Sequence, residues 1–471
     1  MRQCLTSAHG GYYTTSLQKH AGQDIDQFGS KGDFITAPEI SQAFGELLGI
    51  WFVAEWMSQW QELGQNANLE IQRDPKAGVV TDITLQPKIH LIELGPGRGT
   101  LMDDILRTIA RFKQMAMEVR AVYFVEASPA LREKQHFLLC GKESNLEQTT
   151  NGWESVSNKH FEVPIIWVED MSLLPKVELG SPTVPFIIAH EFFDALPIHA
   201  FQSVALAPAP LESSPRKLLD AESQLITHPS SESKNPQWRE LLVAPTKRPV
   251  FQTETTSKSQ QEAQPEFHLT LAKASTPASL VLPESSVRYK RLKSHPGSTI
   301  EVSPEGYRYV QELAKLIGGD NIPLKTATLP SPSKPRPSGA ALIIDYGPSS
   351  NVPGNSLRGI KSHRRVSPFT SPGEIDISAD VDFTALAKAA IDASKGIEVY
   401  GPIEQGVFLK QMGIQQRAEA LMAHAKDDEG KRLVDSAWRR LVDGGPGGMG
   451  KLYKVMAIVP ESGGRRRPVA F

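Results

Sequence analysis

Residues 91–100 read "LIELGPGRGT", a short apolar run followed by an acid and three glycines within five positions. The apolar run begins near residue 88 and is typical of a buried strand, and residues 100–117 after it carry apolar side chains at helical spacing. Glycines between a strand and a helix let the backbone turn tightly and bring its N–H groups close to a ligand. The stretch therefore predicts a ligand-binding turn in an α/β fold.

The same alternation of apolar runs and helical patterns continues along the chain. Further runs suited to buried strands lie at residues 121–128, 165–170, 185–197, 341–347 and 451–459. This alternation predicts a doubly wound parallel α/β sheet. Ligands of such sheets bind beyond the carboxyl ends of the strands, and several of these runs end in acidic residues.

Composition excludes several classes of protein. The 51 basic and 53 acidic side chains among 471 residues give a formal net charge of −2, which leaves no electrostatic footprint for nucleic acid or an anionic membrane. Two cysteines, Cys4 and Cys140, are too few for a disulfide framework or a cysteine zinc site, so we expect a reducing compartment and no metal. The most apolar stretch, residues 44–57, contains two glutamates and is too short to span a membrane.

The chain divides by composition into four segments. Residues 1–80 are expected to form a largely helical N-terminal segment that covers the site, and residues 81–203 and 339–471 to form the two parts of the sheet core. Residues 204–338 are rich in Pro, Ser, Lys and Gln, which predicts a partly disordered insertion. The first 23 residues lack acids, as transit peptides do, but "GGYYTTS" within them favours a turn in folded chain.

The glycine turn favours S-adenosylmethionine over a dinucleotide. A dinucleotide turn reads G-x-G-x-x-G, whereas here Gly95, Gly97 and Gly99 are followed by Thr100 at the position of the last glycine. Glu93 lies just inside the turn, where it would repel a pyrophosphate and attract a cation. S-adenosylmethionine has no phosphate and carries a sulfonium and an ammonium group. The alternative is a structural glycine turn flanked by surface acids.

Each strand-end acid can be assigned a part of this cofactor. The glycines make room for the methionine portion, and Glu93 faces its ammonium group. Glu126 accepts hydrogen bonds from the ribose hydroxyls. Asp170 reaches the adenine amino group, with Met171 against the ring.

A second unusual stretch, "AHEFFDALP" at residues 189–197, places His190, Glu191 and Asp194 around two phenylalanines. Methyl transfer is an in-line displacement, for which an enzyme mainly supplies position and electrostatics. A guanidinium acceptor needs carboxylates that fork its N–H groups and aromatic rings against its planar face. Glu191 and Asp194 meet that need, although the pair also suits another amine or a solvated loop. His190 fits a buried histidine with satisfied hydrogen bonds as well as a catalytic one.

Two more stretches receive no function from their residues alone. "GDFITAPEIS" at residues 32–41 offers a helix start, and its Glu39 reads as an ordinary first-turn acid favoured by the helix dipole. Residues 357–383 hold five basic side chains before four acids. Such a pattern suits a solvated loop or a loop that shapes access to a site.

Six stretches together closely resemble one family. They are "GDFITAPEISQAFGELLGIW", "IELGPGRGTLMDDILR", "AHEFFDALPIHAFQ", "RGIKSH", "DISADVDF" and "GPIEQGVFLKQMGI". They are similar to the mitochondrial MidA family, the class I methyltransferase-fold proteins known as complex I assembly factor 7. The resemblance covers most of residues 10–203 and 340–458, in order. It implies a class I S-adenosylmethionine-dependent methyltransferase fold, a Rossmann-like doubly wound sheet with a helical N-terminal segment and insertions that form a second lobe.

The resemblance also implies a function. It implies a mitochondrial matrix protein arginine methyltransferase, of type II, that symmetrically dimethylates an arginine of a core peripheral-arm subunit of complex I early in assembly. It carries residues 95–100 over as the cofactor loop, and His190, Glu191 and Asp194 as active-site residues.

The resemblance further implies that five N-terminal residues face the cofactor or the substrate: Gly32, Asp33, Thr36, Pro38 and Glu39. Family members carry a targeting segment and an opening helix before the residues that begin this chain, so we expect a truncated N-terminus. Import into the matrix is an expectation from the family alone.

Other functions remain open at this point. A non-catalytic assembly chaperone that retains the cofactor would keep its role in a Glu191→Ala variant. A small-molecule methyltransferase would share the glycine turn, but the broad loops at residues 32–41 and 358–363 suit a protein surface better. An NAD-dependent oxidoreductase is disfavoured because the third glycine is displaced.

Overall fold

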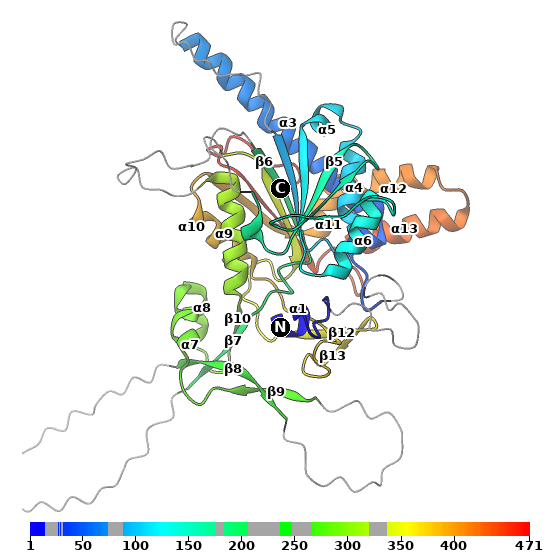
Figure 1. Cartoon of the computed structure of the whole chain (residues 1–471). Helices are drawn as coiled ribbons and strands as arrows, with labels where there is room; N and C mark the ends of the chain where they lie inside the picture. Colours follow the sequence, from blue (N-terminus) through cyan, green and yellow to red (C-terminus); the bar gives the residue numbers. More distant parts are fainter. Residues whose placement is uncertain are drawn as a thin grey trace, which may run out of the picture. The chain divides into compact units, whose positions relative to one another are not determined.

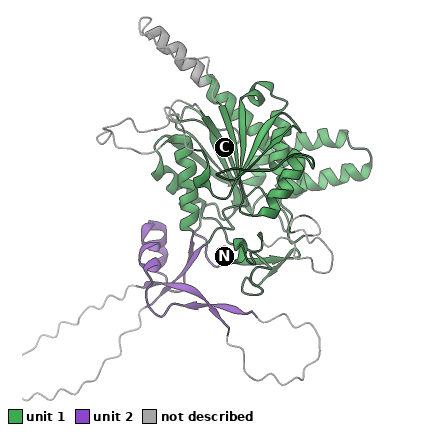
Figure 2. Cartoon of the chain, in the orientation of Figure 1, with its two compact units in different colours: residues 1–197, 303–351, 356–471 green, residues 198–302, 352–355 purple. Residues whose placement is uncertain are grey.

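The computed structural model describes residues 1–14, 27, 29, 32–73, 88–175, 183–205, 236–246, 265–319 and 337–471, with only the backbone described over 62–73. These residues form two compact units (Figure 2). Unit 1 comprises Met1–Pro197, Ser303–Asn351 and Ser356–Phe471, and unit 2 comprises Ile198–Val302 and Val352–Asn355. Much of the expected insertion at 204–338 lies outside the described residues, and the division into four segments stays a prediction.

Unit 1 is built on a nine-stranded sheet with the order β15-β16-β11-β6-β1-β2-β5-β4-β3 (Figure 1). Its five central strands are parallel: β5 (Val163–Val168), β2 (Val119–Val125), β1 (Lys88–Leu94), β6 (Thr183–His190) and β11 (Ala340–Tyr346). The chain leaves β1 towards β2 and β5 and then returns to the other side of β1 through β6, so the strand order reverses between β1 and β6. This topology confirms the predicted doubly wound sheet and locates its switch point, where ligands of such sheets bind.

Antiparallel strands complete the sheet and form two smaller ones. The antiparallel strands of the large sheet are β16 (Tyr453–Pro460) and β15 (Ile397–Glu404) beyond β11, and β4 (Trp153–Ser157) and β3 (Glu147–Gln148) beyond β5. A three-stranded sheet in unit 1 contains β13 (Arg364–Val366), β12 (Arg358–Lys361) and β14 (Asp376–Ser378). Unit 2 contains β10 (Thr299–Val302), β7 (His199–Val204), β8 (Gln237–Pro245) and β9 (Phe267–Leu271), with the short helices α7 (Pro277–Val281), η2 (Pro283–Ser285) and α8 (Val287–Lys293).

The remaining helices belong to unit 1. They are α1 (Arg2–Thr6), α2 (Ala37–Ile40), α3 (Gln42–Arg73), α4 (Thr100–Ile109), α5 (Lys113–Glu118), α6 (Pro129–Cys140), η1 (Met171–Leu173), α9 (Pro304–Gly318), α10 (Phe383–Ala393), α11 (Gln405–Gln411), α12 (Ile414–Ala423) and α13 (Asp428–Val442). Within the described parts of the chain, no helix is both long enough and apolar enough to cross a membrane.

Both faces of the large sheet are buried, which explains why its strands read as continuous apolar runs. Along β1, Leu91 packs into the core cluster that contains residues of α3 and α4. Its neighbour Ile92 packs into the cluster on the opposite face, with residues of α9 and α10. Successive strand residues therefore enter different cores, as the two-residue period of a strand requires.

Two expected elements have different bounds in the structure. The helix expected over 100–117 is two helices, because i→i−3 bonds from Arg111 to Thr108 and from Phe112 to Ile109 end α4 in a tight turn before α5. Within the expected insertion at 204–338, Thr299–Val302 form strand β10 and Pro304–Gly318 form helix α9. Helix α9 belongs to unit 1, together with the large sheet.

A buried ion pair ties the segment after β16 to helix α3. Arg466 Nη1 lies 2.6 Å from Glu55 Oε2, and the two side chains are 8% and 2% exposed. Removing one partner of such a pair leaves an uncompensated buried charge, whereas replacing both by apolar residues is often nearly neutral.

We therefore expect Arg466→Met to lower the free energy of unfolding by about 3–5 kcal/mol, and Glu55→Leu/Arg466→Met to regain most of that loss. Chemical denaturation followed by tryptophan fluorescence measures both. Lys388→Ala, which breaks the exposed Lys388–Asp392 pair, is the control and should change stability by less than about 1 kcal/mol. A double variant as unstable as Arg466→Met would contradict this interpretation of the pair.

Candidate active site

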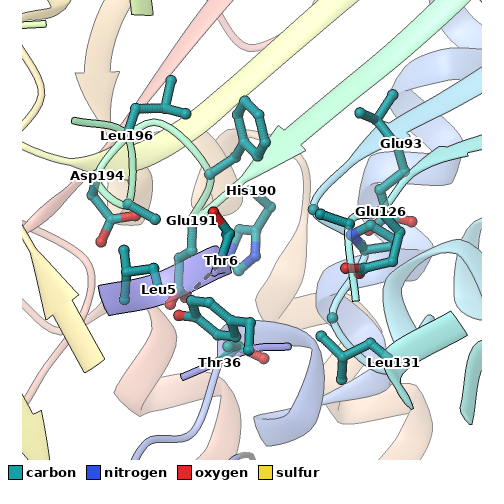
Figure 3. Close-up of a pocket in the computed structure, with 18 of the residues that line it drawn as sticks. Leu5, Thr6, Thr36, Glu93, Glu126, Leu131, His190, Glu191, Asp194 and Leu196 are labelled. Carbon is teal, nitrogen blue, oxygen red and sulfur yellow. Dashed lines mark ion pairs between the residues drawn. The ribbon is translucent and has the colours of Figure 1, made fainter. Parts of the chain in front are cut away.

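A cavity of about 350 Å³ lies at the carboxyl ends of β1, β2, β5 and β6. Twelve residues predicted for the site line it: Thr36, Pro38, Glu39, Glu93, Gly95, Gly97, Thr100, Glu126, Asp170, His190, Glu191 and Asp194. Figure 3 shows Glu93 and Glu126 on one side of the pocket, and Glu191 and Asp194 on the other. The switch point of the sheet thus brings the two predicted acidic groups to one cavity.

Four residues predicted for the site, Gly32, Asp33, Gly99 and Met171, are described but do not line this cavity. Asp33 Oδ2 accepts a hydrogen bond from the Tyr12 hydroxyl at 2.7 Å. Gly32 is buried, and its N–H donates to the carbonyl of Gly29 at 3.0 Å. Gly99 precedes α4, and Met171 begins η1 within the core cluster that contains α9. Their assignment to the cofactor site stays a prediction.

The turn after β1 needs all three of its glycines. Gly95, Gly97 and Gly99 have φ of +63°, +54° and +84°, the left-handed region that side chains with a Cβ disfavour. A Cβ on Gly95 would also come within 3.0 Å of the Phe192 ring. The turn leads directly into Thr100, the first residue of α4.

Glu93 presents an unpaired carboxylate oxygen in this region. The residue is 2% exposed, and among the described residues its Oε2 has no hydrogen-bond partner. Burial, together with the charge of Glu126, raises the pKa of Glu93 well above its usual value. A buried acceptor without a partner beside a cavity is suited to a cationic or N–H-bearing ligand, which fits an ammonium group.

Glu126 is held in place by two hydrogen bonds. Its Oε1 accepts from the backbone N–H of Ser128 at 2.7 Å, and its Oε2 accepts from Gln135 Nε2 at 3.0 Å. Burial raises the pKa of Glu126 to about 7, although these hydrogen bonds oppose the shift. Each oxygen keeps a further acceptor site, so the carboxylate suits a pair of ribose hydroxyls.

Glu39 has a more specific role than a first-turn acid. Its Oε1 accepts a hydrogen bond from Thr100 Oγ1 at 2.8 Å, and its Oε2 pairs with Arg98 Nη1 at 3.0 Å. Helix α2 thereby holds the glycine turn through both oxygens of one carboxylate. The sequence pattern could not reveal this contact, because its partners are about 60 positions away.

Asp170 contacts helix α9 as well as the cavity. Its Oδ2 lies 3.4 Å from Arg308 Nη2 and from the hydroxyl of Tyr309. Burial alone would raise the pKa of Asp170, but hydrogen bonds from Ser172 and the charge of Arg308 lower it overall. Asp170 is therefore an ionised acceptor, as a partner for an amino group requires.

The turn after β6 is held by one buried carboxylate. Asp345 Oδ2, at the end of β11, accepts the backbone N–H groups of Phe192, Phe193 and Asp194 at 3.1, 2.8 and 3.3 Å. Glu191 at the start of this turn has φ of +51°, a rare conformation for a residue with a Cβ. Strain of this kind persists only where surrounding contacts impose it, and it concentrates at functional sites.

The Glu191 carboxyl is oriented by a buried tyrosine. The Tyr453 hydroxyl donates to Glu191 Oε1 at 2.9 Å and is itself hydrogen-bonded to Tyr346. Burial and the charge of Asp194 raise the pKa of Glu191 to about 8. In the empty site at neutral pH the carboxyl is therefore mostly protonated, and it ionises as the pH rises through about 8.

His190 lies beside Glu191 as a neutral ring. Burial lowers its pKa to about 3, so its Nε2, 3.5 Å from Glu191 Oε1, makes a polar contact there without a charge (dashed in Figure 3). Among the described residues this Nε2 has no hydrogen-bond partner. Of the two alternatives left open by the sequence, a buried histidine with satisfied hydrogen bonds does not account for this Nε2, and the catalytic role of His190 stays a prediction.

Further buried carboxyls surround Asp194. Burial and the charges of Asp345 and Asp376 raise the pKa of Asp194 well above its usual value, which Arg358 only partly opposes. Burial raises the pKa of Asp376 to about 6, although Tyr13 donates a hydrogen bond to it at 2.7 Å. Carboxyls crowded in this way are expensive to ionise, and a cationic guest would offset that cost.

Several residues that line the cavity were not predicted from the sequence. They are Arg2, Tyr13, Glu305, Arg308, Tyr309 and Asp376. Those of α9 lay in a region read as an insertion, and those of the N-terminus carried no motif. Asp376 lies in the stretch at 357–383, whose strand β14 also contributes Ser378, so part of that loop shapes the cavity.

Comparison with known proteins places this chain in a family. Residues 47–403 match the model of a family described as "Putative S-adenosyl-L-methionine-dependent methyltransferase". Over 466 residues, the chain is 30% identical to the mitochondrial protein arginine methyltransferase NDUFAF7 homolog of Drosophila melanogaster, covering 98% of this chain and 80% of that protein. It is 29% identical to the mitochondrial protein arginine methyltransferase NDUFAF7 of Homo sapiens, covering 99% and 80%.

A solved structure supports the same fold. The crystal structure of a protein from Burkholderia thailandensis bound to S-adenosyl-homocysteine superposes with a TM-score of 0.59 at 19% identity, covering 100% of this chain and 88% of that one. The family model spans more than half of the chain and includes the glycine turn and the acidic turn after β6. The chain therefore belongs to this family of S-adenosyl-L-methionine-dependent methyltransferases.

Proposed function

We propose that the chain is a protein arginine N-methyltransferase whose acceptor guanidinium binds between Glu191 and Asp194. The observation that carries this proposal is that the buried carboxyl of Asp194 and the largely buried carboxyl of Glu191 line the same cavity as the glycine turn. The names of the Drosophila and human relatives, which are protein arginine methyltransferases, support it.

The finer function follows the family resemblance. The enzyme is of type II and forms symmetric dimethylarginine on a core peripheral-arm subunit of mitochondrial complex I, in the matrix, during assembly. The mitochondrial names of the relatives support the compartment.

Residues at the switch point would hold the cofactor in a defined orientation. Bound S-adenosylmethionine supplies a methyl group on a positively charged sulfonium, ready for in-line displacement. The glycine turn approaches the methionine portion, and Glu93 Oε2 receives its ammonium group. Glu126 accepts from the ribose hydroxyls, and Asp170 accepts from the adenine amino group beside Met171. Thr36 and Pro38 complete the wall towards the N-terminal segment. The role of Gly32, which lies outside the lining, follows the family resemblance alone.

The acidic side of the cavity would bind the acceptor. Glu191 and Asp194 accept hydrogen bonds from the planar guanidinium, whose five donors match two carboxylates better than the point charge of a lysine does. Tyr453 fixes the direction of the Glu191 carboxyl, and neutral His190 adds no competing charge. After transfer, the extra proton passes to Glu191 or to water, and the raised pKa of Glu191 suits this role.

We expect Glu191→Gln to lower kcat/KM for the arginine substrate about 30-fold to 4,000-fold, because truncating one partner of a buried charge pair costs about 2–5 kcal/mol. The assay incubates the chain with methyl-labelled S-adenosylmethionine and the purified core peripheral-arm subunit, and mass spectrometry identifies the methylated residue. Asp104→Asn is the matched control, since Asp104 is also buried with its pKa raised to about 6 but lies outside the cavity lining.

The same assay separates the rival functions. Symmetric dimethylarginine that is lost in Glu191→Gln, with cofactor binding intact, is the expected result. Label that accumulates only in an added small molecule would favour a small-molecule methyltransferase. A chaperone would be favoured if the wild type labels no arginine and the Glu191→Gln variant still restores complex I assembly in cells.

The pH profile gives an independent test. Because the pKa of Glu191 is about 8 in the folded chain and arginine stays cationic throughout, the binding-competent carboxylate forms as the pH rises. We expect kcat/KM for the arginine substrate to increase from pH 6.5 to a plateau above about pH 8.5. A profile that is flat or falls over this range would contradict the role given to Glu191.

A further inference from the structure

Gln135 is a fully buried residue of α6 that does more than donate the hydrogen bond to Glu126 described above. It has 0% exposure and lies outside the cavity lining. Its amide nevertheless contacts both cofactor-facing segments. Its Nε2 donates to the carbonyl of Gly97 at 2.7 Å and to Glu126 Oε2 at 3.0 Å.

The orientation of this amide is fixed by Trp167 on β5. The indole Nε1 donates to Gln135 Oε1 at 2.9 Å. An indole N–H can only donate, so the amide oxygen must face Trp167 and both amide hydrogens must face the cofactor segments. Glutamine supplies the two donors and the one acceptor that these three hydrogen bonds need, whereas a carboxylate of the same shape would lack the two donors.

The amide separates two acceptors that would otherwise repel each other. The Gly97 carbonyl and the Glu126 carboxylate carry negative charge, and one Nε2 group bridges them. The stem of Gln135 also supports the end of the turn, since a Cβ on Gly99 would come within 3.4 Å of Gln135 Cγ. The turn after β1 and the carboxylate after β2 are thus held at a fixed separation by one side chain.

We propose that Gln135 is a positioning residue that sets the distance between the methionine-binding turn and the ribose-binding carboxylate. The proposal rests on the cofactor roles given above to the glycine turn and Glu126. Its consequence is that the two halves of the cofactor are bound cooperatively, because neither segment can move without straining the shared amide. Losing the amide should therefore weaken binding of the whole cofactor without removing any group that touches it.

The test is calorimetric titration of the full chain with S-adenosylhomocysteine, which carries the methionine, ribose and adenine groups and is stable over a wide pH range. Gln135→Met keeps the shape and removes all three hydrogen bonds, and we expect affinity to fall about tenfold to a hundredfold. Gln405→Met is the matched control. Gln405 is equally buried, but its Nε2 donates to the carbonyl of Leu441 at 3.0 Å, outside the cavity lining.

Gln135→Glu separates positioning from a merely structural role through the sign of its pH dependence. In the wild type, lowering the pH from 8 to 6 protonates Glu126, which also interacts with the charges of Glu93 and Arg132. The affinity for S-adenosylhomocysteine should therefore fall over this range. In Gln135→Glu, a carboxyl that keeps its proton can still donate to Glu126, so affinity should instead fall as the pH rises from 6 to 9. A loss of packing alone would leave the sign unchanged.

The outcomes distinguish the inference from the function on which it rests. A wild-type chain that does not bind S-adenosylhomocysteine would overturn the proposed cofactor roles, and this inference with them. A wild type that binds, beside folded Gln135 variants whose affinity lies within twofold of it and whose pH dependence has the same sign, would overturn the inference alone. Thermal denaturation without ligand establishes that each variant is folded. If Gln135→Met does not fold, the pH dependence of Gln135→Glu tests the inference by itself.

Discussion

The candidate site depends on the hydrogen bonds that the Asp345 carboxylate accepts from three successive backbone N–H groups after β6. These bonds fix the turn in which Glu191 adopts a left-handed conformation and faces the cavity. Asp345 is the penultimate residue of β11, the strand next to β6, so the turn after β6 is anchored to the same parallel sheet that carries the glycine turn. In the proposed reaction, a single sheet would position both the methyl donor and the acceptor.

The carboxyls on the acidic side of the cavity are costly to ionise while the cavity is empty. Burial raises the pKa of Glu191, of Asp194 and of Asp345, the last to about 7, so the empty cluster resists full ionisation. Binding a cation there relieves the repulsion among the carboxyls, which is a gain that a neutral guest cannot provide. Glu93, at the opposite side of the cavity, has an Oε2 that lacks a partner among the described residues and is likewise suited to a cation (Figure 3). Both ends of the cavity are suited to positive charge.

The sequence predicted the parts of this structure that depend on local pattern. The continuous apolar runs identified the parallel strands, and the turn at 95–100 could be assigned because its conformation demands glycine. Contacts between distant segments could not be predicted, such as Glu39 with Thr100 or Gln135 with Gly97. Helix α9 was assigned to an insertion because its flanking composition is polar, although its own apolar face packs on the central sheet.

Calorimetric titration of the purified chain with S-adenosylmethionine, run beside NAD and repeated on Gly97→Val, tests most directly whether the glycine turn binds the methyl donor. Gly97 has φ of +54°, so valine there would distort the turn without altering any charged group. We predict that the wild type binds one S-adenosylmethionine and no NAD, and that the folded variant loses this binding. Binding of NAD instead, or unchanged affinity in Gly97→Val, would contradict the assignment of the turn.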